Sequence, residues 1–351
     1  MQTMLTLFNK NRVFFLVVFA LLILCVIFFA RSNPTVQKAS TPIFSVTPTP
    51  FPFQEITIPF LRDRSYKSAL GNLEEIAQTG SYTSYLTSFD SDGLKVNGLL
   101  TKPLGEVPSG GFPAIIFIHG YIPPSQYQTT SQYSDYVDYL ARNGFVVFKI
   151  DLRGHGSSEG QAGGGYFGAD YIIDTLNAYS ALSESGFVNP KKIGLWGHSM
   201  AGNIVLRSTA VKPDIPAVVI WAGAVYSYED REKYGINDSS YQPVTNPTGV
   251  NRRQRLTDLY GQASGGNPFW KQMAPTNFIK DLKGAIQINH AVDDSIVDIG
   301  YSRDLIKLLD NTNVPHEFKE YENGGHNISG NSFNLAMQNT VNFFTKYLEG
   351  K

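Results

Sequence analysis

The chain has 351 residues and a mass of 38.8 kDa; 42% of the residues are hydrophobic and 17% are charged, a composition that excludes a disordered chain. Its 29 Lys and Arg residues against 30 Asp and Glu residues give a net charge of −1. Nucleic-acid binders usually carry a basic excess, so no nucleic-acid partner is expected. The single cysteine, Cys25, excludes an intramolecular disulfide and any metal site built from several thiolates.

The first predicted element is a membrane anchor. Residues 13–30 form an uncharged apolar run, which as a helix would span about 27 Å at about 1.5 Å per residue, close to the hydrocarbon core of a bilayer. Lys10 and Arg12 precede this run and Arg31 follows it. The positive-inside rule places the N-terminus in the cytoplasm. Residues 1–31 therefore predict a single-pass anchor in the cell membrane, with the rest of the chain extracytoplasmic.

Two other readings of the same segment stay open. A cleaved signal peptide would end in a small-x-small site, but Phe28 stands two residues before Ala30. A lipidated Cys25 would follow a small residue, but Leu24 precedes it and the apolar run continues beyond it. The retained anchor is the favoured interpretation.

The segment from residue 32 to residue 54 is predicted to be a linker. It contains five prolines together with several Ser and Thr residues. Proline at this density prevents a helix, and the polar residues give little to pack, which is typical of an extended spacer. The catalytic domain is therefore expected to occupy residues 55–351.

From residue 81 onward the pattern alternates between short apolar strands and amphipathic helices. Two strands flanking a Ser-Asp-Gly turn are followed by repeated strand–helix units, which predicts an α/β fold with a mostly parallel sheet and helices on both faces. Eight strands are expected, at residues 84–89, 94–101, 114–119, 145–151, 192–197, 217–221, 285–290 and 317–321. Helices are expected at residues 132–143, 171–183, 201–211, 302–309 and 333–348.

The alternation breaks between residues 224 and 277. This stretch is rich in Tyr, Gly, Asn and Arg, and only residues 253–259 read as a helix. An insertion of this length between two core strands is usually a lid or a binding loop. Its arginines, Arg252, Arg253 and Arg255, fit a solvated helix face better than an anion site, although an anionic substrate stays possible.

Ser199 is the candidate nucleophile. It lies in Gly197-His198-Ser199-Met200-Ala201-Gly202, where a predicted buried strand turns into a helix. Acyl transfer needs a sharply presented hydroxyl, with a free backbone N–H beside it to hold an oxyanion. A strand–Ser–helix turn offers both, because the first turn of a helix has unpaired N–H groups. The alternative is a serine that only caps a helix.

A serine hydroxyl needs a base, and the base needs an orienting acid. Asp293 and Asp294 follow the predicted strand at 285–290, at the carboxyl edge of the sheet, and His326 follows the last strand on a Gly-rich loop. His316 also lies after the acids in the chain, but it begins a strand at the opposite edge. His326 is therefore the predicted base.

Four motifs in this order resemble the α/β-hydrolase superfamily, in particular the catalytic domain of prolyl oligopeptidase-like serine peptidases and related acyl esterases. They are Ile118-His119-Gly120-Tyr121, residues 151–158 (Asp-Leu-Arg-Gly-His-Gly-Ser-Ser), the Ser199 turn, and the two loops that carry the acid and the base. The resemblance covers residues 81–349. Ala201 replaces the usual second glycine of the nucleophile turn, and Ala291 and Asp298 replace a usual glycine and proline around the acid.

The resemblance implies roles for individual residues. Ser199 would be the nucleophile, His326 the general base and Asp294 the orienting acid, with Asp293 as the alternative acid. Asp294 is preferred because it stands four residues after His290 and three before Val297, as in the family. The backbone N–H groups of Tyr121 and Met200 would form the oxyanion hole. No metal and no cofactor is implied, because this mechanism is complete without one.

The implied activity is a membrane-tethered serine hydrolase acting on a short peptide or a small ester. Only about 50 residues separate the anchor from the first hydrolase strand, so the large propeller of full prolyl oligopeptidases is not expected. A carboxylesterase or feruloyl-type esterase without peptidase activity is the alternative. A non-catalytic binding module on the same fold is a second alternative, and the oligomeric state is left open.

Overall fold

A computed structural model describes residues 20–21, 23, 50–241, 252–263 and 266–350. The predicted anchor lies outside these residues except for Ala20, Leu21 and Ile23. Among the residues that are described, no helix has the length and apolar character needed to cross a membrane. The chain divides into two units, residues 1–50 and 51–351. The second unit contains no cysteine. It starts at Phe51, four residues before the predicted domain boundary at residue 55.

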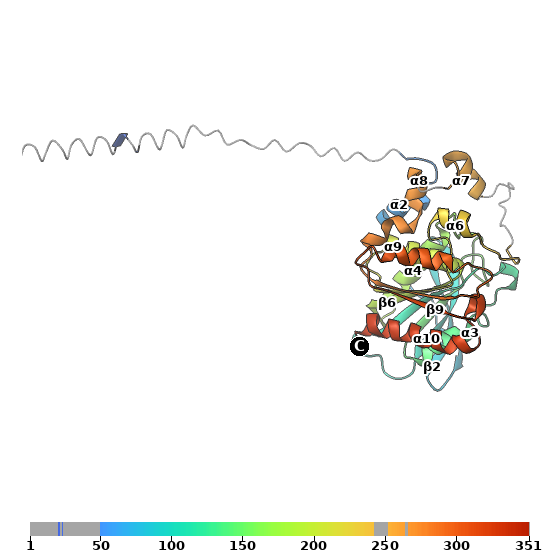
Figure 1. Cartoon of the computed structure of the whole chain (residues 1–351). Helices are drawn as coiled ribbons and strands as arrows, with labels where there is room; N and C mark the ends of the chain where they lie inside the picture. The colour runs from blue at the N-terminus through green and yellow to red at the C-terminus, as the bar shows by residue number, and fades with distance from the viewer. Residues whose placement is uncertain (1–19, 22, 24–49, 242–251, 264–265, 351) are drawn as a thin grey trace, which may run out of the picture. The chain divides into compact units, whose positions relative to one another are not determined.

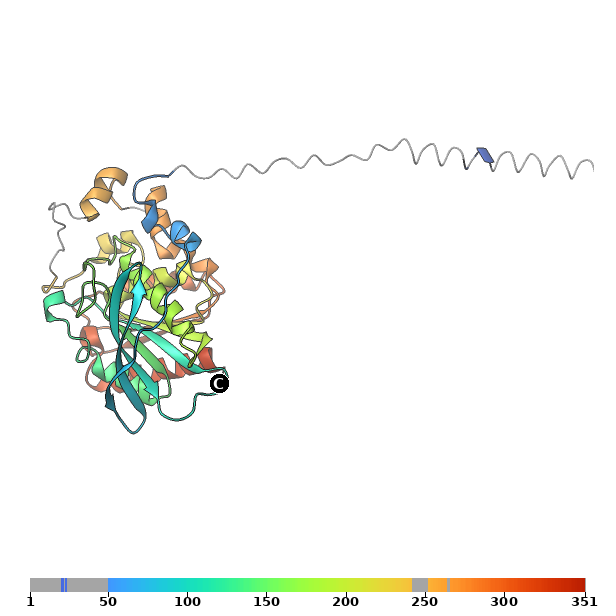
Figure 2. The ribbon, with the colours of Figure 1, turned by 180° about the vertical axis from the view of Figure 1, so that it is seen from behind.

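The second unit is built around one twisted sheet of nine strands in the order β1-β2-β3-β5-β4-β6-β7-β8-β9 (Figures 1 and 2). Strands β1 to β3 and the β3–β5 pair are antiparallel, and the pairs from β5 to β9 are parallel. The strands are β1 Glu74–Gln78, β2 Tyr82–Ser91, β3 Leu94–Pro103, β4 Phe112–Ile118, β5 Val146–Ile150, β6 Val188–His198, β7 Ala217–Trp221, β8 Ala285–Ala291 and β9 His316–Tyr321. The mostly parallel sheet is therefore confirmed.

The expectation of eight strands is wrong by one, because β1 was not anticipated. All five β1 residues, Glu74 to Gln78, are exposed, and the strand pairs only with β2. An exposed edge strand has no buried face, so it lacks the alternation of apolar residues by which strands are recognised. Its glutamates instead protect the edge of the sheet against pairing with another chain.

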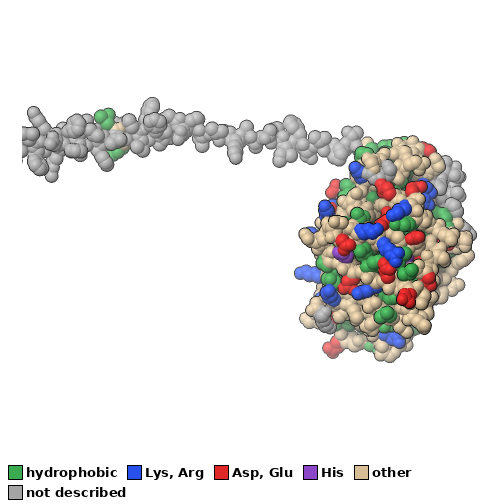
Figure 3. Space-filling view, in the orientation of Figure 1, with side chains coloured by type: hydrophobic (Ala, Val, Ile, Leu, Met, Phe, Trp, Pro, Cys, Tyr) green, Lys and Arg blue, Asp and Glu red, His purple; other side chains and the backbone are tan. Residues whose placement is uncertain are grey.

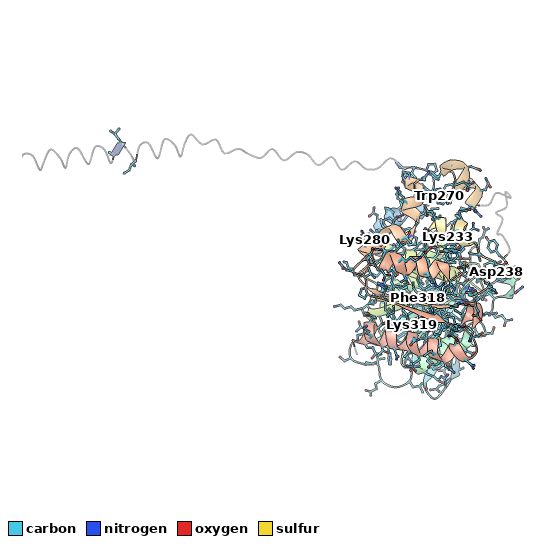
Figure 4. The ribbon with its side chains drawn as sticks, in the orientation of Figure 1. Lys233, Asp238, Trp270, Lys280, Phe318 and Lys319 are labelled. Atoms are coloured by element: carbon cyan, nitrogen blue, oxygen red, sulfur yellow. The ribbon has the colours of Figure 1, made fainter. Side chains whose placement is uncertain are left out.

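The strand at the opposite edge of the sheet, β9, also carries charged side chains. Lys319 and Glu320 project from this strand beside Phe318, and Figure 4 labels Phe318 and Lys319 within it. On the face seen in Figure 3, basic and acidic side chains are interspersed without a broad patch of one sign. Charged, mixed edges of this kind oppose strand addition at both ends of the sheet.

The central strands are buried on both faces, and β4 shows how. Ala114, Ile116 and Ile118 belong to one hydrophobic cluster, while Ile115 and Phe117 belong to a second cluster on the other face. Alternate residues of a strand point to opposite faces, so a strand between two helical layers must be apolar throughout.

Helices cover both faces of the sheet. Helices α4 and α5 pack on the first face, against β4, β6 and β7, and α3 and α10 pack on the second face (Figure 1). The described helices are η1 Gln54–Ile56, α2 Ile58–Asp63, η2 Pro124–Gln126, α3 Ser134–Arg142, α4 Asp170–Ser183, α5 Met200–Val211, α6 Tyr228–Tyr234, α7 Arg252–Tyr260, α8 Pro268–Met273, η3 Pro275–Asp281, α9 Gly300–Leu309, η4 Gly325–Asn327, α10 Asn331–Phe344 and η5 Thr345–Glu349.

The insertion between β7 and β8 holds more helix than the sequence pattern indicated. Besides α7, it contains α6 and α8, so the expectation of a single helix is wrong. Helix α6 begins with a capping box, in which the Ser227 hydroxyl accepts from the Asp230 N–H and the Asp230 carboxylate accepts from the Ser227 N–H. Caps of this kind stabilise short helices that carry little apolar periodicity.

Candidate active site

Ser199 lies in a strained turn between β6 and α5. Its backbone has φ 55° and ψ −118°, a conformation that non-glycine residues rarely adopt. The turn is held by two backbone bonds, from Ser199 N to Trp221 O at 2.9 Å and from Gly202 N to Ser199 O at 2.9 Å. Such strain costs about 1–3 kcal/mol and persists only where the surroundings enforce it. The side chain makes no capping bond to α5, so the helix-cap reading of Ser199 is not favoured.

Gly202 explains how α5 can begin so close to the sheet. A Cβ at this position would lie 2.6 Å from Gly223 Cα, which is closer than real Cβ contacts. Helix α5 therefore passes against the loop after β7 only because residue 202 is glycine. Ala201, which replaces the more usual glycine one position earlier, is fully buried and fits without this clash.

Asp294 and His326 are brought together from two loops, one after β8 and one after β9. Asp294 Oδ2 lies 2.8 Å from His326 Nδ1, and the Asp294 side chain is fully buried. The carboxylate accepts there from the ring N–H, which leaves His326 Nε2 as the unprotonated nitrogen that can take a proton. His326 is thus oriented as a base.

The other lone pairs of Asp294 are also occupied. Asp294 Oδ1 accepts from the backbone N–H groups of Ile296 and Val297 at 2.9 and 3.0 Å, and Oδ2 lies 3.2 Å from His290 Nε2. Burial raises the pKa of Asp294, but the hydrogen bonds from His290 and His326 outweigh it and hold the pKa well below its usual value. The group is therefore a carboxylate at neutral pH.

Asp293, the alternative acid, has a different position. It accepts from the backbone N–H groups of Gly324 at 3.3 Å and Gly325 at 2.8 Å. These bonds hold the loop that carries His326, and among the described residues Asp293 forms no hydrogen bond or ion pair with the His326 ring. Geometry therefore favours Asp294 as the orienting acid.

A chain of three hydrogen bonds connects the turn after β4 with the His326 loop. The Gly120 N–H donates to Tyr133 Oη at 3.0 Å, Tyr133 Oη lies 2.7 Å from His198 Nδ1, and His198 Nε2 lies 2.8 Å from the His326 carbonyl oxygen. A carbonyl can only accept, so His198 carries its proton on Nε2 and the Tyr133 hydroxyl donates to Nδ1. Burial and the neighbouring His326 lower the pKa of His198 to about 3, which keeps the ring neutral.

This chain of hydrogen bonds holds the His326 loop beside the turn that contains Ser199, because His198 directly precedes Ser199. The His198 and His326 ring centroids are 4.6 Å apart. No hydrogen bond joins Ser199 Oγ to the His326 ring among the described residues; catalytic hydrogen bonds often tighten only when substrate is bound. The sequence motifs contain His198 beside Ser199 but do not indicate Tyr133, because no local pattern connects residues so far apart in the chain.

A cavity of about 360 Å³ opens beside Ser199, and the predicted oxyanion residues Tyr121 and Met200 line it with the serine. Met200 is the first residue of α5, where a helix leaves its N–H groups without an intrahelical partner. The structure thus places Ser199, Tyr121 and Met200 on the wall of one cavity. An oxyanion-hole donor typically stabilises the transition state by about 2.7–4 kcal/mol.

Other residues of the sequence motifs hold the loops around the candidate site in place. Arg153 donates to the buried Asp174 through Nε at 3.0 Å and through its terminal nitrogen at 2.6 Å, which ties its loop to α4. His290 Nδ1 lies 2.7 Å from Ser302 Oγ, so α9 helps to hold the ring that orients Asp294. In the described part of the chain no group of His, Cys, Asp and Glu side chains is arranged to hold a metal ion.

The arrangement of strands and helices has counterparts among known proteins. Residues 113–239 match the family described as serine aminopeptidase, S33. The chain has the α/β-hydrolase fold. This α/β-hydrolase is similar in fold to dipeptidyl peptidase 4 of Porphyromonas gingivalis, with a TM-score of 0.58 and 20% identity over 76% of this chain and 36% of that one.

Esterase structures are equally similar to this α/β-hydrolase. Acetyl xylan esterase 1 of Thermoanaerobacterium sp. JW/SL YS485 has a TM-score of 0.56 and 20% identity, over 82% of this chain and 90% of that one. In sequence, the chain is 26% identical to the polyketide transferase claH of Penicillium crustosum, over 54% of this chain and 59% of that protein. It is 29% identical to the uncharacterized peptidase YuxL of Bacillus subtilis, over 46% and 24%. The chain spans less than two thirds of either relative.

Proposed function

We propose that this α/β-hydrolase is a serine hydrolase that cleaves carboxylic-ester or peptide bonds through an acyl-enzyme on Ser199. The observation that carries the proposal is the Asp294–His326 pair, held beside a strained serine turn whose cavity is lined by two candidate oxyanion donors. The peptidases and esterases to which the chain is similar support the same chemistry.

The mechanism follows from the tautomer of His326, which leaves Nε2 unprotonated, and from the position of Ser199 in its turn. His326 Nε2 takes the proton of Ser199 Oγ as the oxygen forms a bond to the substrate carbonyl carbon. The resulting oxyanion accepts from the N–H groups of Tyr121 and Met200. As the bond to the leaving group breaks, His326 returns the proton to that group, and Asp294 stabilises the charged imidazolium in between. Water then repeats both steps and releases the acid.

The test compares the full-length chain with its Ser199→Ala variant on matched short acyl esters and peptide amides, including proline amides. We expect turnover to be lost in the variant, with its thermal unfolding unchanged within about 2 °C. Turnover of esters alone indicates an acyl esterase, and comparable turnover of amides indicates a peptidase. A folded Ser199→Ala variant that keeps full activity would contradict the proposal, as would a wild-type chain that neither turns over these substrates nor reacts with a fluorophosphonate probe.

We also propose that residues 1–31 anchor the enzyme in the cell membrane as a single pass, with the catalytic unit on the extracytoplasmic side. The uncharged run at 13–30 and the basic residues Lys10 and Arg12 support this orientation. After labelling with fluorophosphonate, the chain should stay in the membrane fraction through a high-salt wash and be digested by protease added to intact cells. Recovery of the labelled chain in the soluble fraction would show that it is not anchored.

A further inference from the structure

The cavity beside Ser199 contains more positive than negative charge. Arg231 of α6 and Arg252 and Arg253 of α7 line it, and Asp238 is the only carboxylate among the lining residues that the structure describes. Figure 4 labels Asp238 and Lys233 in this part of the molecule. The remaining lining is largely aromatic and small, including Tyr166 and Phe167.

Two of the three arginines already have carboxylate partners. Arg252 pairs with Asp170 at 2.6 Å, and Arg253 reaches Glu232 at 3.4 Å. Arg231 has no ion pair, and its guanidinium donates no hydrogen bond, among the described residues. Its Nε is buried without a partner. A guanidinium without a carboxylate partner is costly to bury, and an anion in the cavity could pair with Arg231 through its terminal nitrogens.

Arg231 and Arg253 both contact the ring of Phe167. Their guanidinium carbons lie 5.6 and 5.5 Å from the centre of the Phe167 ring. Burial, followed by the charge of Arg231, lowers the pKa of Arg253. Asp238 offsets part of this charge, but among the described residues it forms no ion pair with the arginines, and its Oδ1 accepts from the N–H and the hydroxyl of Ser240 at 2.9 and 2.6 Å. Two guanidinium groups beside the cavity supply positive charge and several N–H donors, which a carboxylate can accept.

The catalytic geometry decides which part of a substrate occupies the cavity. The leaving group must receive its proton from His326, but His326 does not line the cavity, whereas Ser199, Tyr121 and Met200 do. The cavity therefore holds the acyl part of the substrate. Aromatic walls suit its methylene groups, and the planar fork of an arginine suits a carboxylate at its end.

We propose that the cavity binds acyl chains that end in a carboxylate, which pairs with Arg231 and Arg253, so that the preferred substrates are monoesters of short dicarboxylic acids. This inference rests on the proposed serine hydrolase activity. A hydrogen bond to a charged group contributes enough free energy to change selectivity about tenfold to hundredfold.

The experiment measures kcat/KM of the full-length chain on monobenzyl adipate and on benzyl hexanoate, which differ only in the terminal carboxylate. We expect the wild type to favour the adipate at least about tenfold, and Arg231→Gln to lower that ratio by about tenfold. Arg231→Lys, which keeps the charge but not the fork, should keep part of the preference. The control Arg142→Gln, at an exposed position paired with Asp138, should keep the wild-type ratio. A wild-type ratio at or below one, or a ratio unchanged in Arg231→Gln, overturns the inference.

A binding experiment tests the proposed anion site independently of the hydrolase activity on which the inference rests. In the Ser199→Ala chain, adipate should raise the midpoint of thermal unfolding more than hexanoate does, and adding Arg231→Gln should remove the difference. If adipate stabilises Ser199→Ala in this way while the wild type cleaves no ester, the anion site stands and the proposed hydrolase activity fails. If esters are cleaved and adipate has no greater effect than hexanoate, the anion site fails alone.

Discussion

His198 links the turn after β4 to His326, the proposed catalytic base, through hydrogen bonds on both ring nitrogens. Its ring accepts from Tyr133 and donates to the carbonyl of His326, and both bonds require the neutral tautomer protonated on Nε2. Protonation of Nδ1 would turn the bond from Tyr133 into a contact between two donors unless the tyrosine rotates. The neutral ring is therefore part of the folded structure.

This requirement makes the stability of the protein depend on pH. The folded chain holds the pKa of His198 at about 3, whereas an unfolded histidine titrates near 6.5. Between these values the unfolded chain binds the additional proton, so the free energy of unfolding falls as the pH drops from about 6.5 toward 3. Between pH 7.5 and pH 5.0 the contribution of His198 falls by about 2 kcal/mol.

Urea unfolding of the unit that starts at Phe51 measures this effect. His198→Gln keeps a donor for the His326 carbonyl but cannot titrate, so the wild type should lose about 2 kcal/mol more stability than the variant over this pH range. The protein without substitution at pH 7.5 serves as the reference for both series. Equal losses in the two proteins would show that His198 is not held neutral.

Two neighbouring carboxylates on the loop between β8 and α9 have separate tasks. Asp294 accepts from the ring of His326, whereas Asp293 accepts from backbone N–H groups of the loop that carries His326. The first contact fixes a tautomer, which is a chemical requirement of the mechanism, whereas the second restrains a loop that also has other supports, such as the bond from Ser329 N to Gly324 O at 2.9 Å.

We therefore expect Asp294→Asn to lower kcat about a thousandfold or more, because an amide disturbs the tautomer of the base. Asp293→Asn should cost less than about tenfold, because the amide oxygen can still accept from Gly325 N–H. Steady-state kinetics on an ester that the wild type cleaves would compare the two, with circular dichroism to verify folding. The opposite ranking would make Asp293 the orienting acid.

The elements that the sequence predicted well are those with a strong apolar pattern. Strand β7 matches its predicted range at residues 217–221, and α4 and α5 begin within one residue of expectation. The helix α6 was missed although its start carries a readable signal, Ser227 followed three residues later by Asp230. By contrast, the unpartnered state of Arg231 depends on which side chains the fold places around it, and no local pattern encodes that.

At the scale of the whole molecule, the segment from Phe51 to Asp63 is part of the catalytic unit rather than of the linker. Ile56, Ile58 and Leu61 are buried in the main hydrophobic cluster. The buried Arg207 of α5 donates to the Ile56 carbonyl at 2.7 Å and to the Gly168 carbonyl at 2.6 Å. The segment thus joins the outer surface of α5 and satisfies a buried cation.

Removal of this segment should therefore destabilise the unit. A chain that starts at residue 64 should lose several kcal/mol relative to one that starts at Phe51, because three buried apolar side chains, each stabilising by about 1.5–3 kcal/mol, are lost and Arg207 loses an acceptor. Chemical denaturation of both chains gives the difference. The substitution Arg303→Gln, in a surface pair with Glu320, is the control and should change stability by less than about 1 kcal/mol. Equal stability of the two chains would place the segment outside the folded unit.

The absence of cysteine from residues 51–351 makes the insertion between β7 and β8 accessible to site-specific labelling. A chain that starts at Phe51 and carries Glu229→Cys would have a single thiol, at an exposed position of α6 two residues before Arg231. A fluorophore attached there reports on α6 without background from any other site. The rate at which its emission changes after a dicarboxylate is added would report how fast α6 responds, separately from the rate of the reaction at Ser199.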